Sequence, residues 1–180
     1  MRTVGDIVRQ YKKAIKEFPD YHGRIYVNID DTGLGGGVTD RLREVKREDK
    51  LNRLYVVPIN AAEKIETDTK AGKDAAEHYN NLTTHMWAVL KDLMENQEIE
   101  IEEDSETFAQ LSSRKYFLAS NGKLELESKK EMKKRGLDSP DRGDAAALSV
   151  YLGKIKKYTG SAPNQANTAG LGKSSYWKNR

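Results

Sequence analysis

The stretch that decides the fold covers residues 24–42 and reads RIYVNIDDTGLGGGVTDRL. It begins with the run IYVNI, in which nearly every position is apolar or aromatic, as is typical of a short strand buried on both faces. Two adjacent carboxylates follow, then a glycine-rich run, then a segment from Val38 with a helical pattern. The stretch therefore predicts a strand, a turn and a helix, with Asp30 and Asp31 at the carboxyl end of the strand.

The segments on either side of this stretch also alternate between helix and strand patterns. Apolar residues recur at three- and four-residue steps between Val4 and Phe18, which predicts an amphipathic helix. A second dense apolar run, LYVVPIN at residues 54–60, predicts another buried strand that ends near Pro58. Helix, strand, helix and strand with short connections are typical of a parallel sheet with helical crossovers. The predicted fold class is α/β.

The second half of the chain has a different character. Residues 74–96 are predicted to form one long helix with an apolar core stripe, and the segment EIEIEE after it alternates as a strand does. The pair Asn121 and Gly122 between two strand patterns predicts a β-hairpin. A basic helix is expected next, then a last helix with Ser139 as N-cap and Pro140 in its first turn.

Composition sets the limits on domain number and function class. Residues 1–157 are interpreted as one domain and residues 158–180, which hold few apolar side chains, as a flexible polar tail. The chain has 180 residues, a net charge of +3 and no cysteine, which excludes disulfide scaffolds, zinc ribbons and thiol nucleophiles. No apolar run approaches the roughly 20 residues needed to span a bilayer, and the N-terminus lacks a signal-peptide core. We expect a cytoplasmic protein without a membrane partner.

The glycine-rich run is not a phosphate-binding loop. It lacks the Gly-Lys-Ser/Thr ending that supplies a lysine for phosphates and a hydroxyl for magnesium. Asp30 and Asp31 would also repel an anion at this position, and the spacing GLGGG lacks the third glycine of a dinucleotide fingerprint. A plain strand-to-helix turn, with glycines in unusual dihedral angles, is one alternative.

A metal site is the other alternative. Asp141 and Asp144 lie three positions apart at a predicted helix start, so both project from one face. Asp141 alone is explained by the positive end of the helix dipole. Asp144 enters the apolar stretch DAAALSV, where a buried carboxylate needs a cation or donors. With Asp30 and Asp31 at the strand end, these oxygen ligands favour Mg²⁺ or Mn²⁺, and two such ions about 3.5–4 Å apart can hydrolyse a phosphodiester.

Three segments carry a resemblance to a known family: IDDTGLGGGVTDRL at residues 29–42, YNNLTTHMWAVLKDLM at 79–94 and KKEMKKRGLDSPDRGDAAAL at 129–148. They resemble the C-terminal nuclease domain of the large terminase subunit of tailed bacteriophages and prophages, over residues 3–151. The resemblance implies an RNase H-like fold and a metal-dependent endonuclease that cuts concatemeric phage DNA during packaging. It also implies double-stranded DNA, an ATPase motor domain, a small terminase and a portal as partners.

The resemblance assigns roles by position. Asp30 matches the acid at the end of the strand after the first helix, and Asp144 matches the acid of the final helix. Asp141 matches an accompanying ligand one turn earlier, so these three are the candidate catalytic residues. Asp31 is a fourth candidate metal ligand, less favoured than Asp30.

The sequence also departs from the family pattern. In the family a β-hairpin with another essential aspartate precedes the first helix, and this chain starts at that helix. We therefore expect an N-terminally truncated RNase H-like fold with an inserted β-hairpin. Its exposed sheet edge should be compensated by dimerisation, by strand rearrangement or by a partner chain that supplies the missing strands. Asp6 and Asp20 are not expected to replace the absent acid.

Basic residues near these acids allow two interpretations. A DNA-phosphate ledge or a solvated helix face would each explain the run of Lys129, Lys130, Lys133, Lys134 and Arg135. The same choice applies to Arg41, Arg43, Lys46 and Arg47.

Trp87 is expected in the core, whereas Tyr176 and Trp177 in the tail either dock on a surface or belong to a disordered end. Three functions stay open for the whole chain. It is a terminase-type endonuclease, another RNase H-like nuclease such as a junction resolvase, or a non-catalytic module that binds DNA or a packaging partner.

Overall fold

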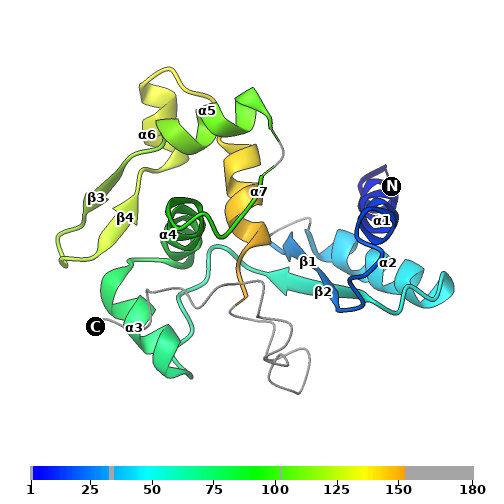
Figure 1. Cartoon of the computed structure of the whole chain (residues 1–180). Helices are drawn as coiled ribbons and strands as arrows, with labels where there is room; N and C mark the ends of the chain where they lie inside the picture. Colours follow the sequence, from blue (N-terminus) through cyan, green and yellow to red (C-terminus); the bar gives the residue numbers. More distant parts are fainter. Residues whose placement is uncertain (1, 33–34, 102, 153–180) are drawn as a thin grey trace. The chain divides into compact units, whose positions relative to one another are not determined.

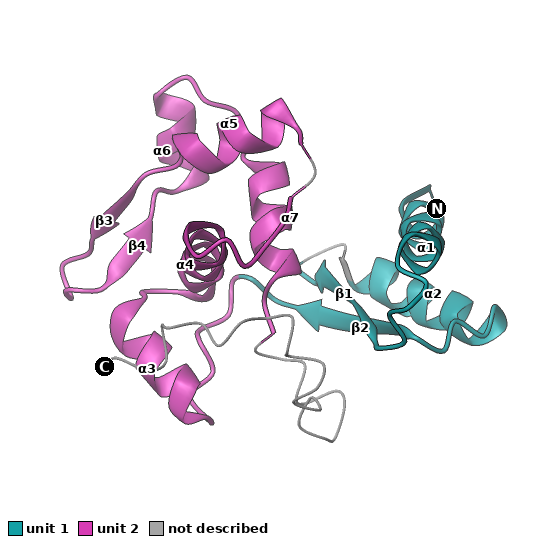
Figure 2. Cartoon of the chain, in the orientation of Figure 1, with its two compact units in different colours: residues 1–61, 154–160 teal, residues 62–153, 161–180 magenta. Residues whose placement is uncertain are grey.

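The computed structural model describes residues 2–32, 35–101 and 103–152. These residues form two compact units, 2–61 and 62–152, coloured teal and magenta in Figure 2. Each unit has its own helices, strands and core. The predicted tail, residues 158–180, lies outside the described residues. Among the described residues no helix is both long and apolar enough to cross a membrane.

The first unit contains two helices and two strands (Figure 1): α1 (Arg2–Glu17), β1 (Ile25–Asp30), α2 (Gly35–Glu48) and β2 (Leu54–Ile59). The strands pair in parallel, from Ile25 opposite Leu54 to Asp30 opposite Ile59. Two backbone hydrogen bonds continue this pairing at its ends, from Ile25 N to Arg53 O and from Asp31 N to Ile59 O. The predicted parallel strands with a helical crossover are confirmed.

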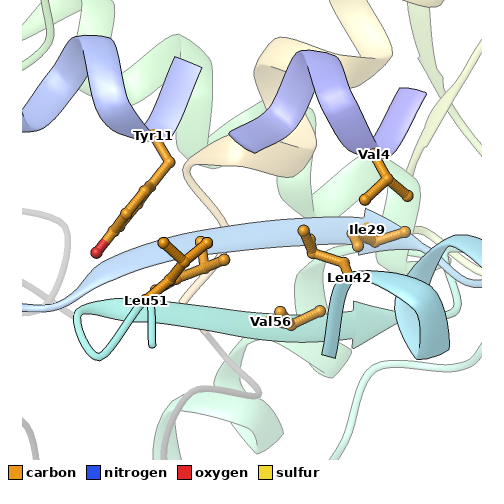
Figure 3. Packing of buried hydrophobic residues seen from close by; sticks show 7 residues of the cluster. Val4, Tyr11, Ile29, Leu42, Leu51 and Val56 are labelled. Atoms are coloured by element: carbon orange, nitrogen blue, oxygen red, sulfur yellow. The ribbon is translucent and has the colours of Figure 1, made fainter. Parts of the chain in front are cut away.

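The core of the first unit lies between the helices and one face of the strand pair. Figure 3 shows Val4 and Tyr11 of α1 pointing toward the strands, where they join Leu42 of α2 and the strand residues Ile29 and Val56. Side chains alternate across a strand, so Asp30 lies on the face opposite to Ile29. The apolar face of the helix therefore fixes which side of the sheet receives this carboxylate.

Two predicted boundaries in the first unit differ from the structure. Helix α2 begins at Gly35, three residues before Val38, so Gly36 and Gly37 are helical and need no unusual dihedral angles. Strand β2 continues through Pro58 to Ile59. The carbonyl groups of residues 53 and 59 both accept hydrogen bonds from the β1 side. By alternation the Pro58 nitrogen points away from β1, so its missing N–H removes no bond of this pair.

The second unit surrounds helix α4, which Figure 1 shows end-on. Its elements are α3 (Lys70–His78), α4 (Leu82–Glu95), α5 (Ser105–Ser113), β3 (Tyr116–Leu118), β4 (Leu124–Leu126), α6 (Lys129–Lys134) and α7 (Asp141–Ser149). Helix α7 packs against α4 and α5. Leu82, Met86 and Leu90 of α4 are buried, as are Met132 of α6 and Ala147 of α7. These side chains form the apolar centre of the unit.

The prediction of one long helix over residues 74–96 is wrong in its middle. The helix stops at His78, and α4 starts at Leu82 with Asn81 as its N-cap, whose side chain accepts from Thr84 N at 2.8 Å. Between them the backbone pairs with β4: Tyr79 bridges Leu124, and Asn80 N donates to Leu124 O. A strand contact and a cap together outweigh the continuous helical pattern.

The predicted hairpin is confirmed. Tyr116 pairs with Leu126 and Leu118 with Leu124 in antiparallel register. Gly122 adopts a positive φ of 77° in the turn, a conformation that glycine adopts without steric penalty. The Asn-Gly signal therefore located the turn correctly.

Two other details of this half were not predicted correctly. The segment EIEIEE forms no strand in its described residues; instead α5 follows it, with Asp104 as N-cap. The N-cap of α7 is Pro140 rather than Ser139. Ser139 donates its hydroxyl to Oδ1 of Asp141 at 2.6 Å. The serine thus bonds the acid of the first turn and not a backbone N–H.

Candidate functional site

The carboxylate of Asp144 is held by three donors of the second unit. Its Oδ1 accepts from Arg114 at 2.7 Å and from the indole Nε1 of Trp87 at 2.9 Å. Its Oδ2 lies 2.9 Å from the Lys129 ammonium. The Arg114 side chain is only 5% exposed and lies over the Trp87 ring, 4.8 Å from its centroid. The predicted need for donors or a cation at Asp144 is met by these groups.

Close packing of α7 on α4 brings Asp144 to these donors. Gly143 precedes the acid, and a Cβ there would lie 2.8 Å from Cη2 of Trp87. Gln110 of α5 fixes the start of α7, because its side-chain oxygen accepts from the backbone N–H groups of Arg142 and Gly143. Pro140 offers no side-chain cap, so Gln110 satisfies N–H groups that the helix leaves unpaired.

Lys129 joins the two acids of α7. Its Nζ lies 3.2 Å from Oδ1 of Asp141 and 2.9 Å from Oδ2 of Asp144. Hydrogen bonds from Ser139 and then Lys129 lower the pKa of the exposed Asp141 carboxyl. Burial lowers the pKa of the Lys129 ammonium, but the bonds to Asp144 and Asp141 outweigh it and the net pKa is raised. One ammonium therefore holds both carboxylates together.

The predicted basic run divides into two groups. Arg135 forms a two-pronged pair with the buried Glu127, at 2.7 and 2.6 Å, and its hydrogen bonds lower the pKa of that carboxyl. Lys129 contacts the α7 acids. Lys130, Lys133 and Lys134 are exposed and form no ion pair with another described residue. Within this basic run, these three lysines are the ones that remain as a candidate surface for phosphate groups.

Asp30 and Asp31 belong to the first unit and differ in their surroundings. Asp30 is exposed, and its Oδ1 accepts from the backbone N and the hydroxyl of Thr32, at 3.1 and 2.5 Å. Asp31 is half-buried and accepts from the hydroxyl of Thr39 at 3.1 Å. The buried threonine orients Asp31, whereas Thr32, in the same turn, is the residue that bonds the Asp30 carboxylate among the described residues. Asp30 is the last residue of β1 and Asp31 follows it directly, so both lie at the carboxyl end of the strand, as the sequence predicted.

Basic side chains of α2 are engaged locally. Arg41 pairs with Glu44 and Glu48, at 2.9 and 3.4 Å, and Arg43 with Asp40 at 3.5 Å. Lys46 lies over the Tyr55 ring, 4.5 Å from its centroid.

Sequence reasoning also missed three residues of the second unit. Trp87 was expected only as core, and Arg114 and Gln110 were not considered. The contacts of Trp87, Arg114 and Gln110 with α7 span 57, 30 and 32 residues of chain. The preference of a buried carboxylate for arginine was an available signal.

The two α7 acids supply oxygen atoms of the kind that divalent cations prefer. Carboxylate oxygens suit Mg²⁺ and Mn²⁺, and the Lys129 ammonium shows that the place between Asp141 and Asp144 accepts a positive charge. Within residues 2–32, 35–101 and 103–152, no three acids or histidines gather closely enough to hold an ion. The pair on α7 fits a cation in charge and atom type, with Lys129 as the competing group.

Comparison with solved structures shows a fold likeness. The chain is similar to the manganese-bound, lysine-to-alanine mutant nuclease domain of the large terminase subunit gp2 of bacterial virus Sf6, with a TM-score of 0.56, 18% identity and 70% of this chain covered. This chain spans 65% of that one. The calcium-bound mutant gives the same TM-score and identity over 70% of this chain and 64% of its own.

The unmutated Sf6 nuclease domain is similar over 78% of this chain and 69% of its own, again with a TM-score of 0.56 and 18% identity. No protein-family model matches the sequence, and no curated protein does. The described chain therefore has a mixed α/β fold like that of the nuclease domain of the Sf6 large terminase subunit.

Proposed function

From this fold likeness we propose that the chain is a divalent-metal-dependent DNA endonuclease of the phage large-terminase type. The observation that carries the proposal is the likeness to nuclease domains whose structures hold manganese or calcium. The proposed substrate is double-stranded DNA, cut from viral concatemers during packaging. A motor domain, a small terminase and a portal are proposed as its partners on the same ground.

The proposed metal ligands are the four predicted acids. Asp141 and Asp144 are the proposed ligands in the second unit, and Asp30 and Asp31 are the proposed ligands in the first. Bound Mg²⁺ or Mn²⁺ would supply a Lewis acid that activates water and stabilises the leaving oxygen of a phosphodiester.

Protein groups around Asp144 have a positioning role in this proposal. Arg114 and Trp87 both bind Oδ1, so the carboxylate cannot rotate freely and its Oδ2 is directed to the Asp141 side. A pre-oriented ligand needs no reorganisation when its cation arrives. Lys129 competes for these same oxygens, because its ammonium contacts one oxygen of each acid.

A module that binds DNA or a packaging partner without cutting is the second candidate. The observation that favours it is the saturation of Asp144 by Arg114, Trp87 and Lys129, together with the absence of a third nearby acid among the described residues. In this case the carboxylates are structural, and full nuclease activity would require a further acid from another segment or chain.

The decisive experiment is nicking of supercoiled plasmid by the full chain with Mn²⁺. We expect cleavage that disappears with a chelator and in Asp144→Asn and Asp30→Asn. Asparagine keeps an acceptor for Trp87 and Arg114 but removes the charge that neutralises the buried guanidinium, so we expect this variant to be folded but less stable. Asp138→Asn is the matched control, because Asp138 is an exposed acid of the same unit between α6 and α7.

The outcomes separate the two candidates. Cleavage by the wild type and Asp138→Asn but not by the other two variants supports the endonuclease. A folded wild type that shifts duplex DNA in a gel but leaves plasmid intact with both Mn²⁺ and Mg²⁺ supports the binding module. Thermal unfolding followed by circular dichroism confirms that each variant is folded.

A further inference from the structure

The second unit contains an apolar cavity of about 850 Å³. Its lining includes Trp87 and Arg114, the donors to Asp144, but no residue of α7 itself. Its walls are provided by helices α4 and α5 and by the β3–β4 hairpin, all of which are labelled in Figure 1. The large apolar side chains that line it include Leu90, Met94, Phe108, Leu111, Tyr116 and Leu126. Its size and lining are those of a site that binds a ligand or a partner.

Several of these side chains are uncovered. Tyr116 is 65% exposed, Phe108 40% and Met94 36%. Tyr116 and its register partner Leu126 face this cavity, whereas Phe117, the next residue of β3, lies on the other face of the hairpin by strand alternation. A contiguous exposed apolar surface of this kind marks a binding site.

The charges at the cavity favour a cationic occupant. Asp92 lines it, and burial raises the pKa of the Asp92 carboxyl, with Lys91 partly opposing this. The two cationic side chains that line the cavity are already paired: Lys91 lies 2.7 Å from Glu95, and Arg114 lies 2.7 Å from Asp144. A half-buried carboxylate is stabilised by a cation that reaches it. The occupant should therefore combine large apolar side chains with positive charge.

The C-terminal segment of this chain has that composition. Residues 176–180 read YWKNR: two aromatic side chains followed by Lys178 and Arg180. These residues lie outside the described part of the chain, which ends at Leu152. About two dozen residues separate Leu152 from this segment and can span up to about 80 Å, so the connection is long enough for any surface of the unit.

The end of the described chain also lies close to the cavity wall. Tyr151 packs edge-on against His85, with ring centroids 6.1 Å apart, and His85 packs against Tyr79 at 5.3 Å. Tyr79 lines the cavity. We propose that residues 176–180 dock in this groove of their own chain, with Tyr176 and Trp177 on the apolar walls and the cationic groups toward Asp92.

Covalent attachment makes such docking favourable even for a weak contact. A tethered segment reaches its site at an effective concentration in the millimolar range, and buried aromatic side chains contribute large apolar areas. Docking would cover Tyr116 and Phe108. This inference does not depend on the proposed nuclease activity, and its test uses no DNA and no metal.

The test is fluorine NMR of the full chain with 5-fluorotryptophan at its two tryptophans, Trp87 and Trp177. Trp177→Phe assigns the two resonances, and Trp87 reports that the unit is folded. We expect the Trp177 resonance to be protected from a soluble paramagnetic agent in the wild type. Protection should be lost in Tyr116→Ala and kept in Phe117→Ala, a matched change on the opposite face of the same strand.

Three results would overturn the proposal. If the paramagnetic agent reaches Trp177 as readily as in a free peptide of residues 172–180, the segment does not dock. Equal protection in Tyr116→Ala, with the Trp87 resonance unchanged, would place it on another surface. Protection that is lost on dilution, together with dissociation of a dimer, would mean that the segment binds a second copy and not its own chain.

Discussion

Trp87 donates its indole N–H to Oδ1 of Asp144 at 2.9 Å, across 57 residues of chain. The bond joins the middle of α4 to the first turn of α7, and it depends on a residue without a side chain. Gly143 leaves the space in which the Trp87 ring lies, since a Cβ there would be 2.8 Å from Cη2. The sequence RGDA thus combines an acid with the glycine that allows its donor to approach.

Gly143→Ala should destabilise the protein. The added methyl group overpacks the Trp87 contact, which typically reduces the free energy of unfolding by about 1–3 kcal/mol. Urea unfolding measures the change. Gly5→Ala is the control, because Gly5 lies in α1 and a Cβ added there would meet no atom within 4 Å; there alanine should add about 0.5–1 kcal/mol. Equal stability of Gly143→Ala and wild type would contradict the packing argument.

Lys129→Met should tighten Mn²⁺ binding to the α7 acids. Methionine keeps much of the apolar stem but removes an ammonium that contacts Asp141 and Asp144. The raised pKa keeps this lysine charged at neutral pH. A unit charge at about 4 Å contributes on the order of 1–4 kcal/mol in water or near a protein surface, so we expect an affinity gain of about tenfold or more by calorimetry.

Lys130→Met is the control for the metal experiment. Lys130 is exposed on the same helix and forms no ion pair with the described residues. Its removal should leave Mn²⁺ affinity close to that of the wild type. If both variants bind Mn²⁺ equally, the competition assigned to Lys129 is wrong.

Replacing Lys130, Lys133 and Lys134 together with alanine should weaken duplex DNA binding. These exposed lysines are the part of the basic run without ion pairs among the described residues. The slope of log affinity against log salt is negative, and each lost phosphate contact reduces its magnitude by about 0.9. Fluorescence anisotropy with labelled duplex at several salt concentrations measures that slope.

A second triple variant tests whether position matters or only net charge. Lys12, Lys13 and Lys16 are exposed on α1 of the other unit, so their replacement removes the same charge elsewhere. We expect a smaller change in the salt slope than for the α6 variant. Identical slopes in the two triple variants would show a nonspecific charge effect and no phosphate ledge on α6.

Acid should destabilise the second unit through His85. Burial lowers the pKa of this imidazole from 6.5 to about 4. Between these values the unfolded chain binds a proton that the folded chain does not, so stability is complete above pH 6.5 and decreases as the pH falls toward 4. The loss is at most about 3 kcal/mol at 1.36 kcal/mol per pKa unit. Urea unfolding between pH 7.5 and 4 measures it.

His85→Phe keeps an aromatic ring beside Tyr79 and Tyr151 but cannot titrate. Its stability should depend less on pH than that of the wild type. The control is His78→Phe, at an exposed position of α3, where the pH dependence should be unchanged. A wild type and a His85→Phe variant with parallel pH curves would disprove the assignment.

The strands and helices of the first unit were predictable because their signals are local. Dense apolar runs located β1 and β2, and spacing located α1. In the second half, longer-range contacts decide the outcome. Tyr79 leaves a continuous helical pattern to bridge Leu124, and no periodicity reports that contact. Helix α5, which is short and polar and has Asp104 as its N-cap, was not predicted.

The candidate site was predictable in its acids but not in their partners. Asp144 lies inside an apolar stretch, and a buried acid requires donors. This requirement follows from the local sequence alone. The identity of the donors depends on which helices meet. Trp87 and Arg114 reach Asp144 only through the packing of α7 on α4 and on the segment after α5. Tertiary contacts of this kind have no sequence period.

The order of these partners along the chain has a consequence for biosynthesis. A ribosome releases Trp87 and Arg114 before Asp144, and domains generally fold as they emerge. Until α7 arrives, the nascent second unit contains a guanidinium without the carboxylate that neutralises it, and burying such a charge is unfavourable. Maturation of this unit therefore waits for α7, and the carboxylate proposed to bind metal also sets the moment at which the surrounding unit closes.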